Sequence, residues 1–462
     1  MDEFQPTIES LSRYETPEWY KDLKFGIYCH WGLQSVPFDG PVDGWYARNM
    51  YIQGSWAYRR HVKKYGHPSE FGLKDFIPMW KAEKFDPDEM CRIFKEAGAQ
   101  YFTPVAIHHD NFDLWDSTHH KWNSVNMGPK KDIIGMFKKA ALKHGLRFGV
   151  TTHLSRTYSW LQPAHHSDKK GRKKGVPYDG ANPEFKDFYL DSSEDDNYAA
   201  PKNPPLSWRQ HWIARMKDLI DKYHPEFFYF DAALPFLGED QGQSGMEVLS
   251  HYYNDNLKQS NGKSHGMLTF KTIPEHGMDV SGISTIDHEV KFPDQFVQDY
   301  WQTDTTIEIG WFRNKYLPKK PWKMVISELV KVVAYNGNML LNVGPNPDGS
   351  LDGKTTEILG KIGKWMKKNG EGIYGTRPWK SPREGNVFFT SKNEKIYSFI
   401  KNPRKRKLTL KQLGFAKLGR KIQQVKGIST GKTIEFDIGD DSIQLYLPIE
   451  TQKEFFPCLE FS

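Results

Sequence analysis

Residues 226–231 of the chain, Glu-Phe-Phe-Tyr-Phe-Asp, form a short aromatic run that ends in a carboxylate. A continuous apolar run of this length indicates a strand that is buried on both faces, as the strands of a parallel sheet are. Further runs of this kind lie between residues 24 and 372. They are Phe25–His30, Tyr101–His108, Arg147–His153, Met267–Phe270, Ile283–Asp287 and Met339–Val343.

Segments with helical periodicity separate several of these runs. Asp86-Pro87-Asp88 starts a helix with an acidic first turn, and Gly98 ends it. Two others span residues 129–144 and 207–223. Roughly seven or eight strand–helix units in this length favour a closed barrel, and no run is followed by the glycine-rich loop of a nucleotide-binding open sheet. We therefore predict a TIM-type (β/α)8 barrel over residues 1–375.

The pattern changes after Arg377-Pro378-Trp379. Helical periodicity ends, and short alternating segments follow, separated by Gly, Asn, Lys and Asp turns. They are Val387–Thr390, Lys395–Ile400, Lys407–Leu410, Ile422–Val425, Thr433–Phe436 and Ser442–Leu447. We predict a small C-terminal antiparallel β-sandwich over residues 376–462.

Composition excludes several classes of protein. The net charge of +7 over 462 residues is too small to imply an anionic partner, and no basic module with interleaved aromatic residues indicates nucleic acid binding. No apolar run is long enough for a membrane span, and the N-terminal residues lack the features of a signal peptide. Three widely spaced cysteines argue against a disulfide framework or a metal knuckle. The oligomeric state stays open.

Polar residues end several of the predicted strands: His30, His108 with His109, His153 and Asp231. In a barrel, these strand ends surround the active site. Asp231 would act there as a nucleophile or a general base, and the alternative is an acid that caps a helix or anchors a loop. Adjacent residues on a strand point to opposite sides, so His108 and His109 are not expected to share a metal ion. We predict no metal, and hydrogen bonds from the imidazoles to substrate hydroxyls.

Aromatic residues are abundant, with 15 Trp, 22 Tyr and 29 Phe. They either fill the core or line a cleft in which sugar rings stack on flat apolar faces. Together with a buried carboxylate, they describe a carbohydrate site. Hydrolysis of a glycosidic bond with retention needs two carboxyl groups about 5–5.5 Å apart. Asp231 would supply the first, and the second must come from a later loop.

Ordered motifs along the chain resemble one known family. The first is Lys24-Phe25-Gly26-Ile27 with His30-Trp31-Gly32 and Ser35-Val36-Pro37, and the matching segments that follow are 85–87, 97–101, 108–112, 114–115, 122–124, 128–132, 145–149, 337–345 and 369–379. In this order they resemble the α-L-fucosidases of glycoside hydrolase family 29, and the resemblance covers residues 20–380.

The resemblance implies a retaining, exo-acting α-L-fucosidase without a metal or an organic cofactor. Asp231 matches the position of the family's nucleophile. The residues that match positions holding the terminal fucose are His30, Trp45, His108, His109 and Tyr229. The implied partner is a fucosylated oligosaccharide or polysaccharide. Family habit points to the periplasm or to secretion.

The chain also departs from the family pattern. Gly44 replaces a fucose-contacting Glu, Thr151 and Thr152 replace two Tyr, and Val290 replaces an Arg. Gln302 stands where some members have a Glu that serves as acid/base, and an amide cannot donate a catalytic proton.

Three interpretations of Gln302 stay open. The acid/base lies elsewhere, with Glu289 as first choice and Glu275 as second, and Gln302 then only contacts substrate. Alternatively, the chain is an engineered Glu→Gln knockout. The third interpretation is a sugar-binding protein that has lost hydrolysis.

Two features suggest an anionic substrate. Loss of a carboxylate at Gly44 removes negative charge beside the sugar, and the loop Lys169–Lys174 is basic. Both changes lower the cost of binding a sulfate or a carboxylate. The fucose end, or the glycan around it, is therefore expected to carry sulfate, although a basic loop can also be simply solvated.

Overall fold

The computed structural model describes residues 2–37, 45–195, 200–271 and 282–462. Eight parallel strands form a closed barrel in sequential order, and β8 pairs with β1. The strands are β1 (Phe25–Cys29), β2 (Tyr101–Ile107), β3 (Arg147–Thr152), β4 (Phe227–Phe230), β5 (Met267–Lys271), β6 (Thr285–Asp287), β7 (Trp301–Thr306) and β8 (Gly337–Asn342). The predicted (β/α)8 barrel is confirmed.

Seven strands coincide with the apolar runs of the sequence. The strand that the apolar runs do not indicate is β7, because all of its residues except Trp301 are polar. Gln302 and Asp304 point into the barrel, where Tyr28 of β1 and Tyr229 of β4 both donate hydrogen bonds to Asp304, over 2.7 and 3.2 Å. Strands on different sides of the barrel thus meet at one buried carboxyl group.

Long helices surround the strands. They are α5 (Pro87–Glu96), α6 (Ile133–Lys143), α9 (Leu206–Tyr223), α10 (Gln243–Gln259), α11 (Trp322–Ala334) and α12 (Gly353–Asn369). The α6 helix starts later than the predicted residue 129, because the Asp132 side chain accepts from the amide of Gly135 and so caps the helix. Among the described residues, no helix is long and apolar enough to cross a membrane.

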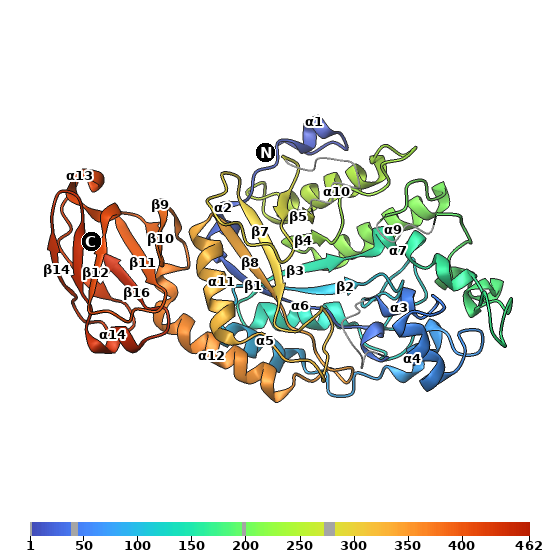
Figure 1. Cartoon of the computed structure of the whole chain (residues 1–462). Helices are drawn as coiled ribbons and strands as arrows, with labels where there is room; N and C mark the ends of the chain where they lie inside the picture. The colour runs from blue at the N-terminus through green and yellow to red at the C-terminus, as the bar shows by residue number, and fades with distance from the viewer. Residues whose placement is uncertain (1, 38–44, 196–199, 272–281) are drawn as a thin grey trace.

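The C-terminal residues form two antiparallel sheets (Figure 1). One has the order β13-β16-β11-β10-β9 and the other β12-β15-β14. Their strands are β9 (Arg377–Glu384), β10 (Val387–Lys392), β11 (Lys395–Ile400), β12 (Lys407–Leu410), β13 (Val425–Gly427), β14 (Glu435–Ile438), β15 (Ile443–Tyr446) and β16 (Cys458–Phe461). Side chains of both sheets share one apolar cluster, as in the predicted sandwich.

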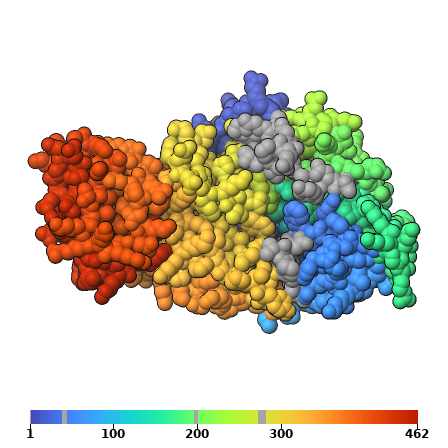
Figure 2. Space-filling view, in the orientation of Figure 1, coloured from blue at the N-terminus to red at the C-terminus, as the bar shows by residue number. Residues whose placement is uncertain are grey.

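The two sheets form a lobe on one side of the barrel, next to α11 and α12 (Figures 1 and 2). The indole of Trp365 on α12 donates to the carbonyl of Phe455 over 3.0 Å, and Tyr335 packs edge-on against Phe388 of β10. The loops that follow the carboxyl ends of β2 and β3 lie on the opposite side of the molecule in this view (Figure 1). The lobe therefore supports the barrel away from these loops.

A buried ion pair anchors one of these loops. Arg215 of α9 and Asp113, which follows β2, are both fully buried, with Nη2 2.5 Å from Oδ1. Arg215 also donates from Nη1 to Asn111 Oδ1 over 2.8 Å. The guanidinium thus connects α9 to the segment that follows His108 and His109.

Replacement of Arg215 by Met is expected to lower the free energy of unfolding by about 3–5 kcal/mol, because it leaves the Asp113 carboxylate buried without its cation. Urea unfolding at neutral pH measures the change. The matched control is Arg92→Met, since Arg92 pairs with Glu89 and Glu96 on an exposed helix surface and should cost less than about 1 kcal/mol. Equal costs for the two variants would contradict a structural role for the Arg215 pair.

Candidate active site

Asp231 follows β4 at the mouth of the barrel and is almost fully buried. Lys271 Nζ lies 2.6 Å from its Oδ1, and His153 Nε2 lies 2.5 Å from its Oδ2. Arg156 Nη2 is 3.9 Å from Oδ1. Burial alone would raise the pKa of Asp231, but the charges of Lys271 and His153 hold it well below its usual range. Asp231 is therefore an ionised carboxylate, suited to nucleophilic attack and not to proton donation.

His153 faces an acceptor on both sides of its ring. Nε2 meets the Asp231 carboxylate, and Nδ1 lies 3.3 Å from the carbonyl oxygen of Ile107. The ring thus lies between these two acceptors, and a positive charge on it stabilises the ionised Asp231 carboxylate. His153 thus serves as a second cation for Asp231.

Lys271 ends β5 and links Asp231 to a second carboxylate. Its Nζ lies 3.0 Å from Glu289 Oε2, and 40% of the Glu289 side chain is exposed. Burial would lower the pKa of Lys271, but the carboxylates of Asp231, Asp304 and Glu289 raise it above its ordinary value. Because one ammonium contacts both, Asp231 and Glu289 lie on the same side of the barrel mouth, and the two contacting oxygens are no farther apart than the sum of the two contact distances.

A pair of buried acids lies beneath Lys271. Burial raises the pKa of Asp304 to about 6, and burial together with the charge of Asp304 raises that of Asp287 well above its usual range. Two carboxyl groups that interact in a low-dielectric interior lose their protons as a coupled pair. Asp304 has almost no exposed surface, so it supports the charge of Lys271 and does not face a ligand.

Gln302 also lies in this lower layer. It is fully buried; its Nε2 donates to Asp287 over 2.6 Å, and its Oε1 accepts from the Tyr20 hydroxyl over 2.5 Å. The predicted contact between Gln302 and substrate finds no support in this geometry, because the amide is occupied inside the barrel. Tyr229 is likewise buried, with its hydroxyl on Asp304.

The predicted histidines gather around Asp231. Burial lowers the pKa of His30 to about 3 and those of His108 and His109 well below the usual range. His109 donates from Nδ1 to the carbonyl of His153 over 3.2 Å, and Asn342 Oδ1 accepts from Nδ1 of His30 over 3.1 Å. Neutral imidazoles fixed in this way offer directional hydrogen bonds to hydroxyl groups.

Nitrogens of His30, His108 and His153 come within 4.8 Å of one another, a spacing that metal ligands adopt. The donor set does not suit a cation. Nε2 of His153 lies against the Asp231 carboxylate. Gln34 accepts from the amide of Ala47 with its Oε1 and so turns its Nε2 toward Nδ1 of His108, which leaves the His108 proton on Nε2. His108 therefore presents an N–H group and His153 faces a carboxylate, so the three rings do not offer three free nitrogens to one ion.

Trp45 is 40% exposed and packs edge-on against Trp160, with ring centroids 5.1 Å apart. Trp160 in turn stacks on His109 at 4.1 Å. These rings form an apolar wall beside the histidines.

Two further residues of the sequence prediction, Glu275 and Gly44, lie outside the described residues.

The sequence analysis missed Lys271, Arg156 and the pair Asp287 and Asp304. A signal for Lys271 was present: like Asp231, it is a charged residue that ends an apolar run. Arg156 had no such signal, because it ends a short 3-10 helix (Leu154–Arg156), four residues beyond the end of β3.

Comparisons with known proteins give matches to a single family. The family model described as Alpha-L-fucosidase matches residues 1–371. The tissue α-L-fucosidases of Rattus norvegicus and Homo sapiens are 28% and 29% identical to the chain, covering 86% of it and 78% of each relative. The crystal structure of Thermotoga maritima α-fucosidase with a mechanism-based inhibitor superposes with a TM-score of 0.79 at 26% identity, covering 99% of both chains.

Proposed function

The chain belongs to the α-L-fucosidase family, glycoside hydrolase family 29, and we propose that this glycoside hydrolase releases terminal α-L-fucosyl residues with retention, using Asp231 as nucleophile and Glu289 as acid/base. The observation that carries the proposal is the ionised Asp231 carboxylate, held between His153 and Lys271 at the barrel mouth. Glu289 shares Lys271 with it and is partly exposed.

The reaction proceeds in two steps. Asp231 attacks the anomeric carbon and forms a glycosyl ester, while Glu289 gives its proton to the leaving glycosidic oxygen. Glu289 then takes a proton from water, which attacks the same carbon and releases fucose and the Asp231 carboxylate. The neutral imidazoles of His30, His108 and His109 hold the sugar hydroxyls, and Trp45 with Trp160 offers an apolar wall to its methyl group.

Replacement of Asp231 by Gly is expected to lower kcat on an aryl α-L-fucoside by about 10⁴-fold or more. Azide should restore part of the activity and give the β-fucosyl azide, because it enters from the face that the carboxylate has vacated. Glu289→Ala should retain activity on substrates with good leaving groups, lose it on oligosaccharides, and give the α-fucosyl azide. NMR identifies the products.

Glu275→Ala is the matched control for Glu289. If Glu275→Ala shows the azide product and Glu289→Ala does not, the acid/base role belongs to Glu275. Gln302→Glu should give no gain in activity and a lower Tm, because it adds a carboxyl group beside Asp287. A gain in activity in Gln302→Glu would mean that the acid/base position is residue 302 and that the Gln there has removed it. If the wild-type chain binds fucosides and releases no product, the protein is a sugar-binding protein.

The pH profile tests the role of Lys271. In the wild type, the low pKa of Asp231 places the acid limb of kcat/KM below about pH 4. Burial raises the pKa of Asp231, and Lys271 is the charge that lowers it most. In Lys271→Met this pKa should therefore rise, and the acid limb should move upward by at least about one pH unit. Lys331→Met, which removes a pair with Asp294 on the surface of α11, is the control. An unshifted limb in Lys271→Met would contradict the proposed ion pair.

A sulfated or otherwise anionic glycan is the second part of the proposal. Its support is Arg156, whose buried Nε has no hydrogen-bond acceptor among the described residues, and the exposed basic loop Lys169–Lys174. A guanidinium suits sulfate oxygens. Sulfated fucosyl oligosaccharides should have a higher kcat/KM than desulfated ones, and Arg156→Gln should reduce the difference by about tenfold. A preference for the desulfated form would count against this part alone.

A further inference from the structure

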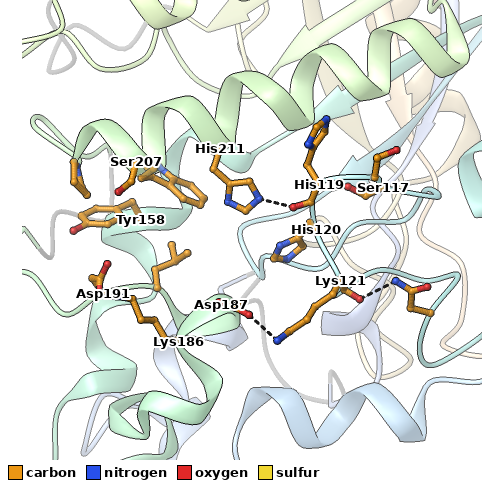
Figure 3. Close-up of a pocket in the computed structure, with 15 residues that line it drawn as sticks. Ser117, His119, His120, Lys121, Tyr158, Lys186, Asp187, Asp191, Ser207 and His211 are labelled. Carbon is orange, nitrogen blue, oxygen red and sulfur yellow. Dashed lines mark hydrogen bonds and ion pairs between the residues drawn. The ribbon is translucent and has the colours of Figure 1, made fainter.

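A cavity of about 710 Å³ lies among the loops that follow β2 and β3 and the first turn of α9. Figure 3 shows side chains from these three segments around one open space. Its volume falls in the range of cavities that bind small ligands in proteins. None of the residues assigned above to catalysis or to fucose binding lines it.

We propose that this cavity is a second glycan-binding site, which takes a neutral sugar unit of the substrate beyond the fucose. The proposal rests on the proposed function, because it concerns the remainder of the same glycan.

Aromatic rings supply the apolar part of the site. Tyr158 and Trp208 line the cavity with ring centroids 6.1 Å apart and planes inclined by 35°. The Nε1–H of Trp208 has no acceptor among the described residues, and a buried donor without a partner costs free energy. Sugars combine C–H faces that pack on rings with hydroxyl oxygens that accept such a hydrogen bond.

Two neutral imidazoles supply acceptors. Burial lowers the pKa of His211 to about 4 and that of His120 well below its usual range. Nε2 of His211 donates to the carbonyl of His119, and Nε2 of His120 donates to that of Asn111, each over 2.9 Å. The neutral tautomers therefore leave Nδ1 of both rings as acceptors for hydroxyl groups.

The charges at the rim cancel in pairs. Lys121 Nζ lies 2.6 Å from Asp187 Oδ2, and Lys186 Nζ lies 2.7 Å from Asp191 Oδ1 (Figure 3 draws the first pair). These groups still offer donors and acceptors at the cavity mouth, but no net charge is left to attract an ion. A neutral sugar fits this balance better than a sulfated one.

One short segment connects the cavity to the active site. Arg156 contacts Asp231, and Tyr158 of α7 (Thr157–Trp160) lines the cavity. Trp160, at the end of the same helix, stacks on His109. The same short helix therefore supplies one side chain to the cavity and another to the apolar wall beside the histidines.

Kinetics on two substrates test the proposal. With 4-nitrophenyl α-L-fucoside, which has no sugar beyond fucose, His211→Ala should keep kcat/KM within about twofold of the wild type. With neutral fucosylated oligosaccharides of increasing length, it should raise KM by about tenfold for the longer ones while kcat is kept. His251→Ala is the matched control, because it removes an imidazole of α10 that pairs with Asp221 of α9.

Binding without turnover separates this proposal from the catalytic one. The Asp231→Gly protein, with 1-deoxyfuconojirimycin filling the fucose site, should still bind an array of neutral oligosaccharides, and adding His211→Ala should abolish that binding. Lys121→Ala, on the exposed rim, replaces His211→Ala if the latter has a lowered Tm. No retention on the array, or equal retention by the variants, overturns the second site. Failure of the wild type to hydrolyse the aryl fucoside overturns the proposed function instead.

Discussion

The burial of one negative charge, that of Asp231, sets the requirements for the rest of the barrel mouth. An ionised carboxylate away from water is costly unless cations compensate it. Here the cations come from the neighbouring strand ends, with His153 after β3 and Lys271 at the end of β5. They can meet Asp231 only because β3, β4 and β5 are adjacent and parallel. The order of these three strands and the ionisation of the nucleophile are thus linked.

The buried charges beneath the active site are also compensated by neighbouring groups. Lys271 is itself buried and needs more than one carboxylate, and Asp304 lies 4.0 Å from it. Asp304 is held by hydroxyl groups of Tyr28 and Tyr229, and Asp287 by the amide of Gln302. The interior of the barrel is polar at this level because each charge needs hydrogen-bonded partners. These residues stabilise the site without touching the sugar.

This polar interior also marks the limit of prediction from sequence. Apolar runs revealed seven strands and the strand-end residues His30, His108, His109 and Asp231. They could not reveal β7, whose inward residues are Gln302 and Asp304, nor β9, which contains two prolines and several charges. The sequence motif placed Gln302 beside the substrate, but in the structure Gln302 lies deeper in the barrel than the catalytic groups. The register of β7 against its neighbours sets how deep each side chain lies in the barrel. Asp304, two residues after Gln302 on the same face of the strand, is the residue that lies near Lys271.

Lys271 also explains how one site can serve both steps of the proposed reaction. In the proposed reaction, the negative charge lies on Asp231, 2.6 Å from the ammonium, before attack, and Glu289 reacts in the form that carries the proton it donates. In the glycosyl ester, Asp231 is neutral and the charge lies on Glu289, 3.0 Å from the same ammonium. The charge moves from one partner of Lys271 to the other, so the cluster as a whole keeps its net charge. A site whose dipoles and charges need not rearrange during the reaction avoids the reorganisation cost that water would impose.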